Sequence, residues 1–209
     1  MTYLPELLTV ASIHLLAVMS PGPDFFLISR NSLVYSRKAG IYSALGLALG
    51  ISVHIAYSLL GIGLIISKSV VLFSLIKFLG AGYLIYIGYK SLYAQSPAVH
   101  AADEEKKEDL PISQAIRVGF LTNILNPKVT LFFLALFTQV INPQTPLPVQ
   151  LLYGLEMAFM TFAWFAGVAT LLSHSIVRSR FAFIQQYAEK FFGAILIVLG
   201  IKVAISSSK

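Results

Sequence analysis

Long apolar runs, each about as long as a bilayer is thick, recur along the chain. Three of them, 39–67, 129–155 and 157–177, contain no Asp, Glu, Lys or Arg. A helix needs about 20 residues to cross a hydrocarbon core of ~30 Å. These runs therefore predict segments that span a membrane.

The apolar runs favour helices over the strands of a membrane barrel. Spanning strands show segments of about ten residues in which polar and apolar side chains alternate, whereas 45–60 and 132–141 are apolar without alternation. We therefore expect an all-α integral membrane protein with about six transmembrane helices. The predicted segments are 5–34 (interrupted at Pro21 to Pro23), 40–66, 69–93, 113–141 (interrupted at Asn126 and Pro127), 148–176 and 184–206.

Composition agrees with this class. Of 209 residues, 57% are hydrophobic and 11% are charged, whereas soluble domains carry about 25% charged residues. The chain has no cysteine, which excludes disulfides, thiolate metal ligands and thiol-redox chemistry. No basic stretch precedes the first apolar run, so we expect it to stay as a membrane segment and not to be a cleaved signal peptide.

The net charge of +6 is better explained by topology than by nucleic-acid binding, because the basic residues lie mostly in connections between the predicted helices. By the positive-inside rule, the richer side faces the cytoplasm and the C-terminus lies outside. The N-terminus lies outside if there are six spans, or inside if the broken first segment enters and returns. The basic residues counted in and near the connections are Arg30, Arg37, Lys38, Lys90, Lys106, Lys107, Arg117, Arg178 and Arg180 on the cytoplasmic side, and Lys68, Lys202 and Lys209 on the other.

Two halves of the chain resemble each other. We expect residues 1–94 and 113–209 to be repeats of three helices each, joined by a charged cytoplasmic linker at 95–112. Chance similarity between apolar, Gly-rich helices is the alternative. The matching features are Lys77-Phe-Leu-Gly-Ala81 with Lys190-Phe-Phe-Gly-Ala194, Ile87-Gly88-Tyr89-Lys90 with Leu199-Gly200-Ile201-Lys202, and Pro23, Gly50 and Gly63 with Pro127, Gly154 and Gly167, the last set at a constant offset of 104.

An odd number of spans in each half would insert the second copy upside down. Inverted repeats of this kind are common in secondary transporters, whose sites lie where Pro or Gly breaks helices at corresponding positions. Here the corresponding breaks are Ser20-Pro21-Gly22-Pro23-Asp24 and Asn123-Ile124-Leu125-Asn126-Pro127-Lys128. Each proline suits the first position of a new helix, with Ser20 and Asn126 as nearby caps. The amides at such helix starts attract anions, which suits a substrate carboxylate.

These motifs resemble those of a known family. The Ser-Pro-Gly-Pro-Asp-Phe-Phe run at 20–26, the Asn-Pro-Lys run at 126–128 and the two-half layout resemble the LysE-type amino-acid exporter superfamily, most closely its homoserine/threonine efflux family. The resemblance covers nearly the whole chain. It implies a multi-pass protein of the bacterial inner membrane that exports a small neutral amino acid, such as threonine or homoserine, by proton antiport. It does not fix the amino acid.

The two breaks supply the candidate substrate site. An ionisable side chain at membrane depth costs at least ~2.5–3.5 kcal/mol, which makes Asp24 and Lys128 candidates for function. They occupy equivalent positions of the two halves, and we expect Asp24 to hold the ammonium and Lys128 the carboxylate of a zwitterionic amino acid. A structural ion pair or gate is the alternative. The predicted substrate-binding residues are Pro21, Gly22, Pro23, Asp24, Asn123, Asn126, Pro127 and Lys128.

Three side chains are candidates for proton coupling: Asp24, Glu156 and His54. Glu156 lies inside the fifth predicted segment, and burial favours the neutral form of a carboxyl, which suits proton binding. A helix-packing hydrogen bond is the alternative. His54 lies in a charge-free segment, where a packing role is the more common finding. His14 is a weaker candidate than these.

Other classes of function find no support in the residues. The sequence shows no Ser-His-acid, metal or cofactor signature, so we expect neither an enzyme nor a bound metal or cofactor. The expected partners are an amino acid, protons and the lipid bilayer, without nucleic acid. A channel or exporter for another small solute or an inorganic cation is the alternative. Gly46 and Gly50 form a GxxxG pair, which serves helix packing or a dimer contact, so a homo-oligomer is a further alternative.

Overall fold

The computed structural model describes residues 3–68, 70–93, 108–142 and 144–173, and beyond them only 187, 190–191, 193–198, 200–201 and 204–205. Within these residues the chain is helical and contains no strand, which confirms the predicted all-helical class. Most of the predicted linker at 95–112 lies outside the described residues. The predicted segment 184–206 is described only at scattered positions, all of them helical.

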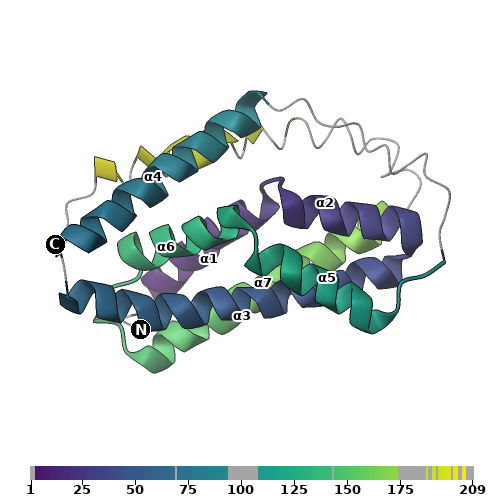
Figure 1. Cartoon of the computed structure of the whole chain (residues 1–209), viewed down its shortest axis with the longest axis horizontal. Coiled ribbons are helices and arrows are strands. Elements are labelled where there is room, and N and C mark those ends of the chain that lie inside the picture. Colours follow the sequence, from purple (N-terminus) through teal and green to yellow (C-terminus); the bar gives the residue numbers. More distant parts are fainter. Residues whose placement is uncertain are drawn as a thin grey trace.

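The helices form an elongated bundle in which α3 runs along most of the long axis and α4 lies along one side (Figure 1). Both predicted breaks are present: α1 and α2 are bent by 58° at the first, and α5 and α6 by 57° at the second. The elements are α1 (Leu4–Met19), α2 (Pro23–Arg30), a π-helix η1 (Asn31–Tyr35), α3 (Arg37–Lys68), α4 (Val70–Tyr93), α5 (Ile112–Ile124), α6 (Pro127–Gln139) and α7 (Leu147–Leu172).

Among the described residues, two helical stretches are long and apolar enough to cross a membrane alone, Arg37–Leu60 and Leu147–Leu172. If each bent pair counts as one span, the number rises to four within the part of the chain that the structure describes. On α7, Leu151, Leu155 and Phe159 follow one another at spacings of four and are all exposed. An apolar stripe of this kind is unfavourable in water and suits contact with lipid tails.

Close packing of α3 against α5 brings the second break into the bundle. A Cβ atom on Gly46 would overlap the Ile116 carbonyl oxygen, and one on Gly119 would overlap the Ser43 carbonyl oxygen. Only glycine lets the two backbones approach so closely at these positions. Gly46 therefore serves helix packing inside the chain, which is the first of the two roles expected for the GxxxG pair.

Candidate functional site

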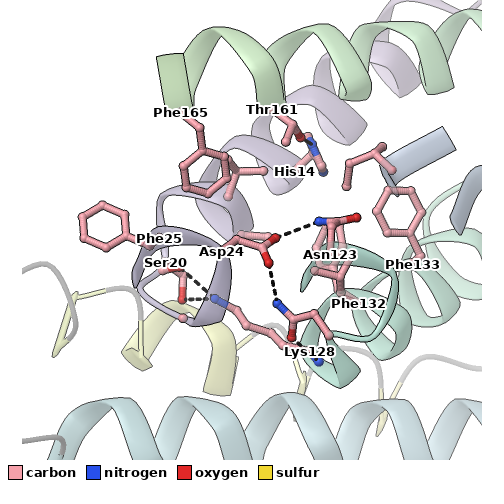
Figure 2. A pocket seen from close by; sticks show the side chains of 16 residues that line it. His14, Ser20, Asp24, Phe25, Asn123, Lys128, Phe132, Phe133, Thr161 and Phe165 are labelled. Atoms are coloured by element: carbon pink, nitrogen blue, oxygen red, sulfur yellow. Dashed lines mark hydrogen bonds between the residues drawn. The ribbon is translucent and has the colours of Figure 1, made fainter. Parts of the chain in front are cut away.

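The two helix breaks meet and line a common pocket (Figure 2). The pocket holds about 440 Å³ of empty space, a figure that includes open space at its mouth. It combines a cluster of polar groups with an aromatic wall. The polar lining residues are His14, Ser20, Asp24, Asn123, Asn126, Lys128 and Thr161, and the aromatic ones are Phe25, Phe132, Phe133 and Phe165.

The first break carries no side-chain cap of its own. The helix α1 ends at Met19 and α2 begins at Pro23, which lacks a backbone N–H. The prediction that Ser20 caps α2 is wrong, because Gly22 occupies the cap position and Ser20 ends α1 instead. The reason is that the extended Gly22 backbone separates Ser20 from the first turn of α2. The carbonyls freed by this break need donors from elsewhere.

Lys128 of the second break supplies those donors. Its ammonium lies 2.8 Å from both the carbonyl oxygen and the hydroxyl of Ser20, and 3.2 Å from the carbonyl oxygen of Pro21. A lysine ammonium has three N–H groups, so each has an acceptor here. The positive charge also lies at the C-terminal end of α1, where the helix dipole favours a cation. Lys128 thus completes the end of a helix that belongs to the other half of the chain.

The second break has its own cap and also holds Asp24. The Asn126 side-chain oxygen accepts a hydrogen bond from the Lys128 backbone N–H at 3.0 Å, which confirms the predicted Asn126 cap. The Asn126 side-chain amide donates to one carboxylate oxygen of Asp24 at 3.0 Å, and that of Asn123 donates to the other at 2.7 Å. Asp24 is only 8% exposed. Each of its oxygens keeps capacity for one more donor.

Asp24 and Lys128 therefore reach different partners in this conformation. The carboxylate receives the two asparagine amides, whereas the ammonium donates to Ser20 and Pro21. No salt bridge joins these two side chains, both of which lie in the part of the chain that the structure describes. Figure 2 shows each charged side chain crossing to the opposite break. Both charges lie at one pocket without neutralising each other by direct contact.

Five of the predicted substrate residues line the pocket, and three do not. The Pro21 carbonyl oxygen accepts a hydrogen bond from Lys128, and the other two prolines are the first residues of α2 and α6. The five lining residues are Gly22, Asp24, Asn123, Asn126 and Lys128, and the three others are Pro21, Pro23 and Pro127.

His54 lies behind the pocket and contacts it through Asn123. Its Nε2 is 3.1 Å from the Asn123 carbonyl oxygen, and a carbonyl only accepts, so Nε2 carries the hydrogen. Its Nδ1 is 2.6 Å from the Tyr57 hydroxyl, and its ring stacks on Phe133. The ring thus holds the segment that places the Asn123 amide on Asp24.

Glu156 lies on α7 and is not part of the pocket lining. It is half-buried, and its Oε2 atom is buried without a hydrogen-bond partner among the residues that the structure describes. The helix-packing hydrogen bond offered as the alternative for Glu156 is not made by this oxygen. A buried, unpaired carboxyl oxygen is able to take up a proton.

Two further pocket residues are His14, which was only a weak candidate from the sequence, and Thr161, which was not predicted. His14 lies at the pocket on α1 and is 1% exposed, and its Nε2 contacts the Met157 carbonyl oxygen at 3.1 Å and the Thr161 hydroxyl at 3.0 Å. The helical spacing of the sequence contains a signal for His14. His14, Ala17, Val18 and Pro21 lie on one face of a helix, and this face leads to the first break.

A helical bundle with an exposed apolar stripe and a polar pocket between two broken helices has the form of a membrane transporter for a small solute. The family model for the LysE type translocator matches residues 15–207. The chain belongs to this family, as its motifs led us to expect.

Two relatives match nearly the whole chain. The threonine efflux protein of Escherichia coli (strain K12) is 32% identical over 95% of this chain and 97% of its own length. An uncharacterized membrane protein of Bacillus subtilis, YrhP, is 34% identical over 96% of this chain and 99% of its own. No solved structure matches the chain.

Proposed function

We propose that this protein exports a small neutral amino acid from the cytoplasm across a bacterial inner membrane, with its binding site in the pocket between the two breaks. One observation carries the proposal: a single pocket presents a carboxylate with unused acceptor capacity and an ammonium group. These charges complement the two ends of a zwitterion. The likeness to a protein named for threonine efflux supports an amino acid as the cargo.

In this proposal, Asp24 receives the ammonium group of the substrate, which fills the free acceptor positions of its two oxygens. The substrate carboxylate approaches Lys128 and the uncapped start of α2. Because all three Lys128 N–H groups already have acceptors, the carboxylate displaces one of them. The Ser20 hydroxyl is the easiest to displace, since it rotates freely while the two carbonyl oxygens are fixed by the backbone.

The proposed arrangement of two inverted repeats, 1–94 and 113–209, has support from reciprocal contacts. The two helix pairs are bent by 58° and 57°, and each break offers a charged side chain to the other. A Cβ atom on Gly88 would lie 2.6 Å from the Gly193 carbonyl oxygen, and one on Gly200 would lie 2.8 Å from the Ala81 carbonyl oxygen. These residues belong to the repeated Lys-Phe and Gly-containing motifs. Two halves related by a two-fold axis make contacts in such reciprocal pairs.

Export is coupled to protons through Asp24 or Glu156 in this account. Asp24 binds the substrate and can exchange it for a proton, and Glu156 offers an unpaired oxygen within the span α7. His54 acts on this system through the position of Asn123. An inorganic cation as cargo has less support, because the Lys128 ammonium lies in the same pocket and repels cations.

Counterflow into liposomes tests the function. Purified protein is reconstituted into liposomes loaded with one unlabelled amino acid, and entry of the same labelled amino acid is measured across the twenty common ones. We expect one or a few small neutral amino acids to exchange, and Asp24→Asn to abolish this exchange. Glu108→Gln, which removes an exposed carboxylate outside the pocket, is the matched control and keeps activity. Exchange of none of the twenty by the wild-type protein contradicts the proposal.

Proton coupling needs a second measurement on the same liposomes. An imposed pH gradient drives accumulation of the amino acid in the wild-type protein, while counterflow needs no gradient. Because Asp24→Asn is expected to lose exchange altogether, Glu156→Gln is the variant that isolates coupling: we expect it to keep counterflow and to lose the gradient-driven accumulation. If Glu156→Gln accumulates the amino acid as the wild-type protein does, proton coupling through Glu156 is wrong.

A further inference from the structure

His14, a residue of the pocket lining, has one buried ring nitrogen without a hydrogen-bond partner. His14 lies on α1 and is 1% exposed, and its Nδ1 atom has no hydrogen-bond partner. The ring's other nitrogen, Nε2, contacts the Met157 carbonyl oxygen and the Thr161 hydroxyl. Since a carbonyl oxygen only accepts, Nε2 carries the hydrogen, and Nδ1 of the neutral ring is an unused acceptor. A buried acceptor left unpaired is costly unless a ligand completes it.

The position of His14 fits the polar end of a ligand. The ring lies at the pocket that Asp24 and Asn123 also line, and in the view of Figure 2 it lies above them, with Lys128 below. The two bonds of Nε2 to α7 fix the ring's orientation, and the ring packs against Phe132 and Phe133 at centroid distances of 5.8 and 6.0 Å. The ring of His14 is therefore held in one orientation at the pocket, with its Nδ1 atom buried and unpaired.

We propose that His14 binds the substrate's ammonium group through Nδ1, together with the carboxylate of Asp24. The proposal rests on the function proposed above and names the chemical group that this end of the pocket selects. A primary ammonium has three N–H donors. The two Asp24 oxygens and the His14 nitrogen offer three acceptors for them. The Asn123 side-chain oxygen is also unpaired, but it faces Gly50, where a Cβ atom would lie 2.6 Å away.

The site therefore takes a primary α-amino acid and discriminates against the same acid without its amino group. When that group is missing, the Asp24 carboxylate keeps only its two neutral amide donors and gains no cation, and the His14 nitrogen keeps no donor at all, which lowers affinity. A purely structural His14 would instead tie α1 to α7 through Nε2 and would affect all ligands alike. The two roles use different nitrogens of the same ring.

Competition binding on the purified full-length protein separates the two roles. The probes are L-threonine and 3-hydroxybutanoate, which keeps the carboxylate and the hydroxyl but lacks the ammonium. The affinity ratio between them is compared in the wild type, His14→Phe, His14→Asn and the control Ser12→Ala. Ser12 lies on the same helix and is exposed, and its hydroxyl bonds only to the Leu8 carbonyl of its own helix. If the wild type does not bind L-threonine, the amino acid that it does bind and its deaminated acid replace the two probes.

The expected result follows from the geometry of the ring. His14→Phe keeps the aromatic packing but removes the acceptor, so the ratio falls by roughly 10- to 100-fold while the deaminated acid binds as before. His14→Asn has an amide oxygen near the Nδ1 position and retains most of the ratio, and Ser12→Ala retains all of it. Equal losses for both ligands in His14→Phe, or a ratio in His14→Asn as low as in His14→Phe, overturn the assignment of Nδ1. A wild-type protein that binds none of the twenty amino acids contradicts the proposed function itself.

Discussion

Lys128 shows how a single charged residue serves both structure and binding. Its ammonium donates to two carbonyl oxygens and a hydroxyl at the end of α1, so the carbonyls freed at this break have donors inside the bundle. Asp24 has the opposite character. Neutral amides hold it on one side, and its remaining acceptor positions are unused. We therefore expect the two charges to differ in how much they matter for folding and for binding.

Replacing Lys128 by Met tests this difference. The variant leaves the Ser20 and Pro21 oxygens without donors, and each buried unpaired group costs about 1–3 kcal/mol. We expect Lys128→Met to lower the thermal unfolding temperature of the purified protein clearly, whereas Asp24→Asn lowers it less and mainly weakens binding. Lys90→Met, which removes an exposed lysine of α4, serves as the control and changes stability little. A Lys128→Met protein as stable as the control would contradict the helix-completing role.

The positions of the two helix breaks were predictable from the sequence, whereas the hydrogen-bond partners of the side chains at these breaks were not. Two prolines in the first break and an Asn-Pro pair in the second fix the places where helices end and restart, and the charges next to them indicate a polar site. The choice of partners depends on how far each side chain reaches in space. The cap position predicted for Ser20 is therefore occupied by Gly22, and the bonds from the Lys128 ammonium to the first break were not predictable from the sequence.

The packing of α3 against α5 connects helix geometry to the site. Gly50 of α3 faces the Asn123 side chain, and a Cβ atom there would lie 2.6 Å from the side-chain oxygen and 2.8 Å from the Cβ of Asn123. Asn123 cannot stay in place if this space is filled. Asn123 donates a hydrogen bond to Asp24 at 2.7 Å. The contact between α3 and α5 therefore helps to fix the position of the Asp24 carboxylate.

We expect Gly50→Ala to weaken amino-acid binding several-fold and to destabilise the protein by about 1–3 kcal/mol through overpacking. Gly167→Ala is the matched control, because a Cβ atom on Gly167 of α7 would meet nothing within 4 Å. Alanine is the better helix former there, so this variant should be as stable as the wild type or more so. Equal behaviour of the two variants in binding and thermal unfolding would show that α3 does not position Asn123.

At the scale of the whole molecule, the proposed orientation places the α2–α3 connection and the start of α5 in the cytoplasm. Ser36 and Asp109 are joined by a hydrogen bond of 2.8 Å and so lie on the same side of the bundle. The absence of cysteine makes the test direct. In intact cells, a cysteine at Glu108 should be shielded from an impermeant thiol reagent, and one at Gln144 should be labelled. Both positions are exposed. The reverse pattern would contradict the assigned orientation.

The central claim is that the amino acid binds in the pocket between the two breaks, and protection of a cysteine in that pocket tests it most directly. Ala17 lines the pocket, so Ala17→Cys places one thiol there in an otherwise cysteine-free chain. Alkylation by a small thiol reagent is followed in purified protein with and without the amino acid that counterflow selects, with Gln144→Cys as the control outside the pocket. The account predicts that the amino acid slows alkylation at residue 17 and leaves residue 144 unchanged. Unchanged alkylation at residue 17, in a variant that still exchanges the amino acid, would contradict it.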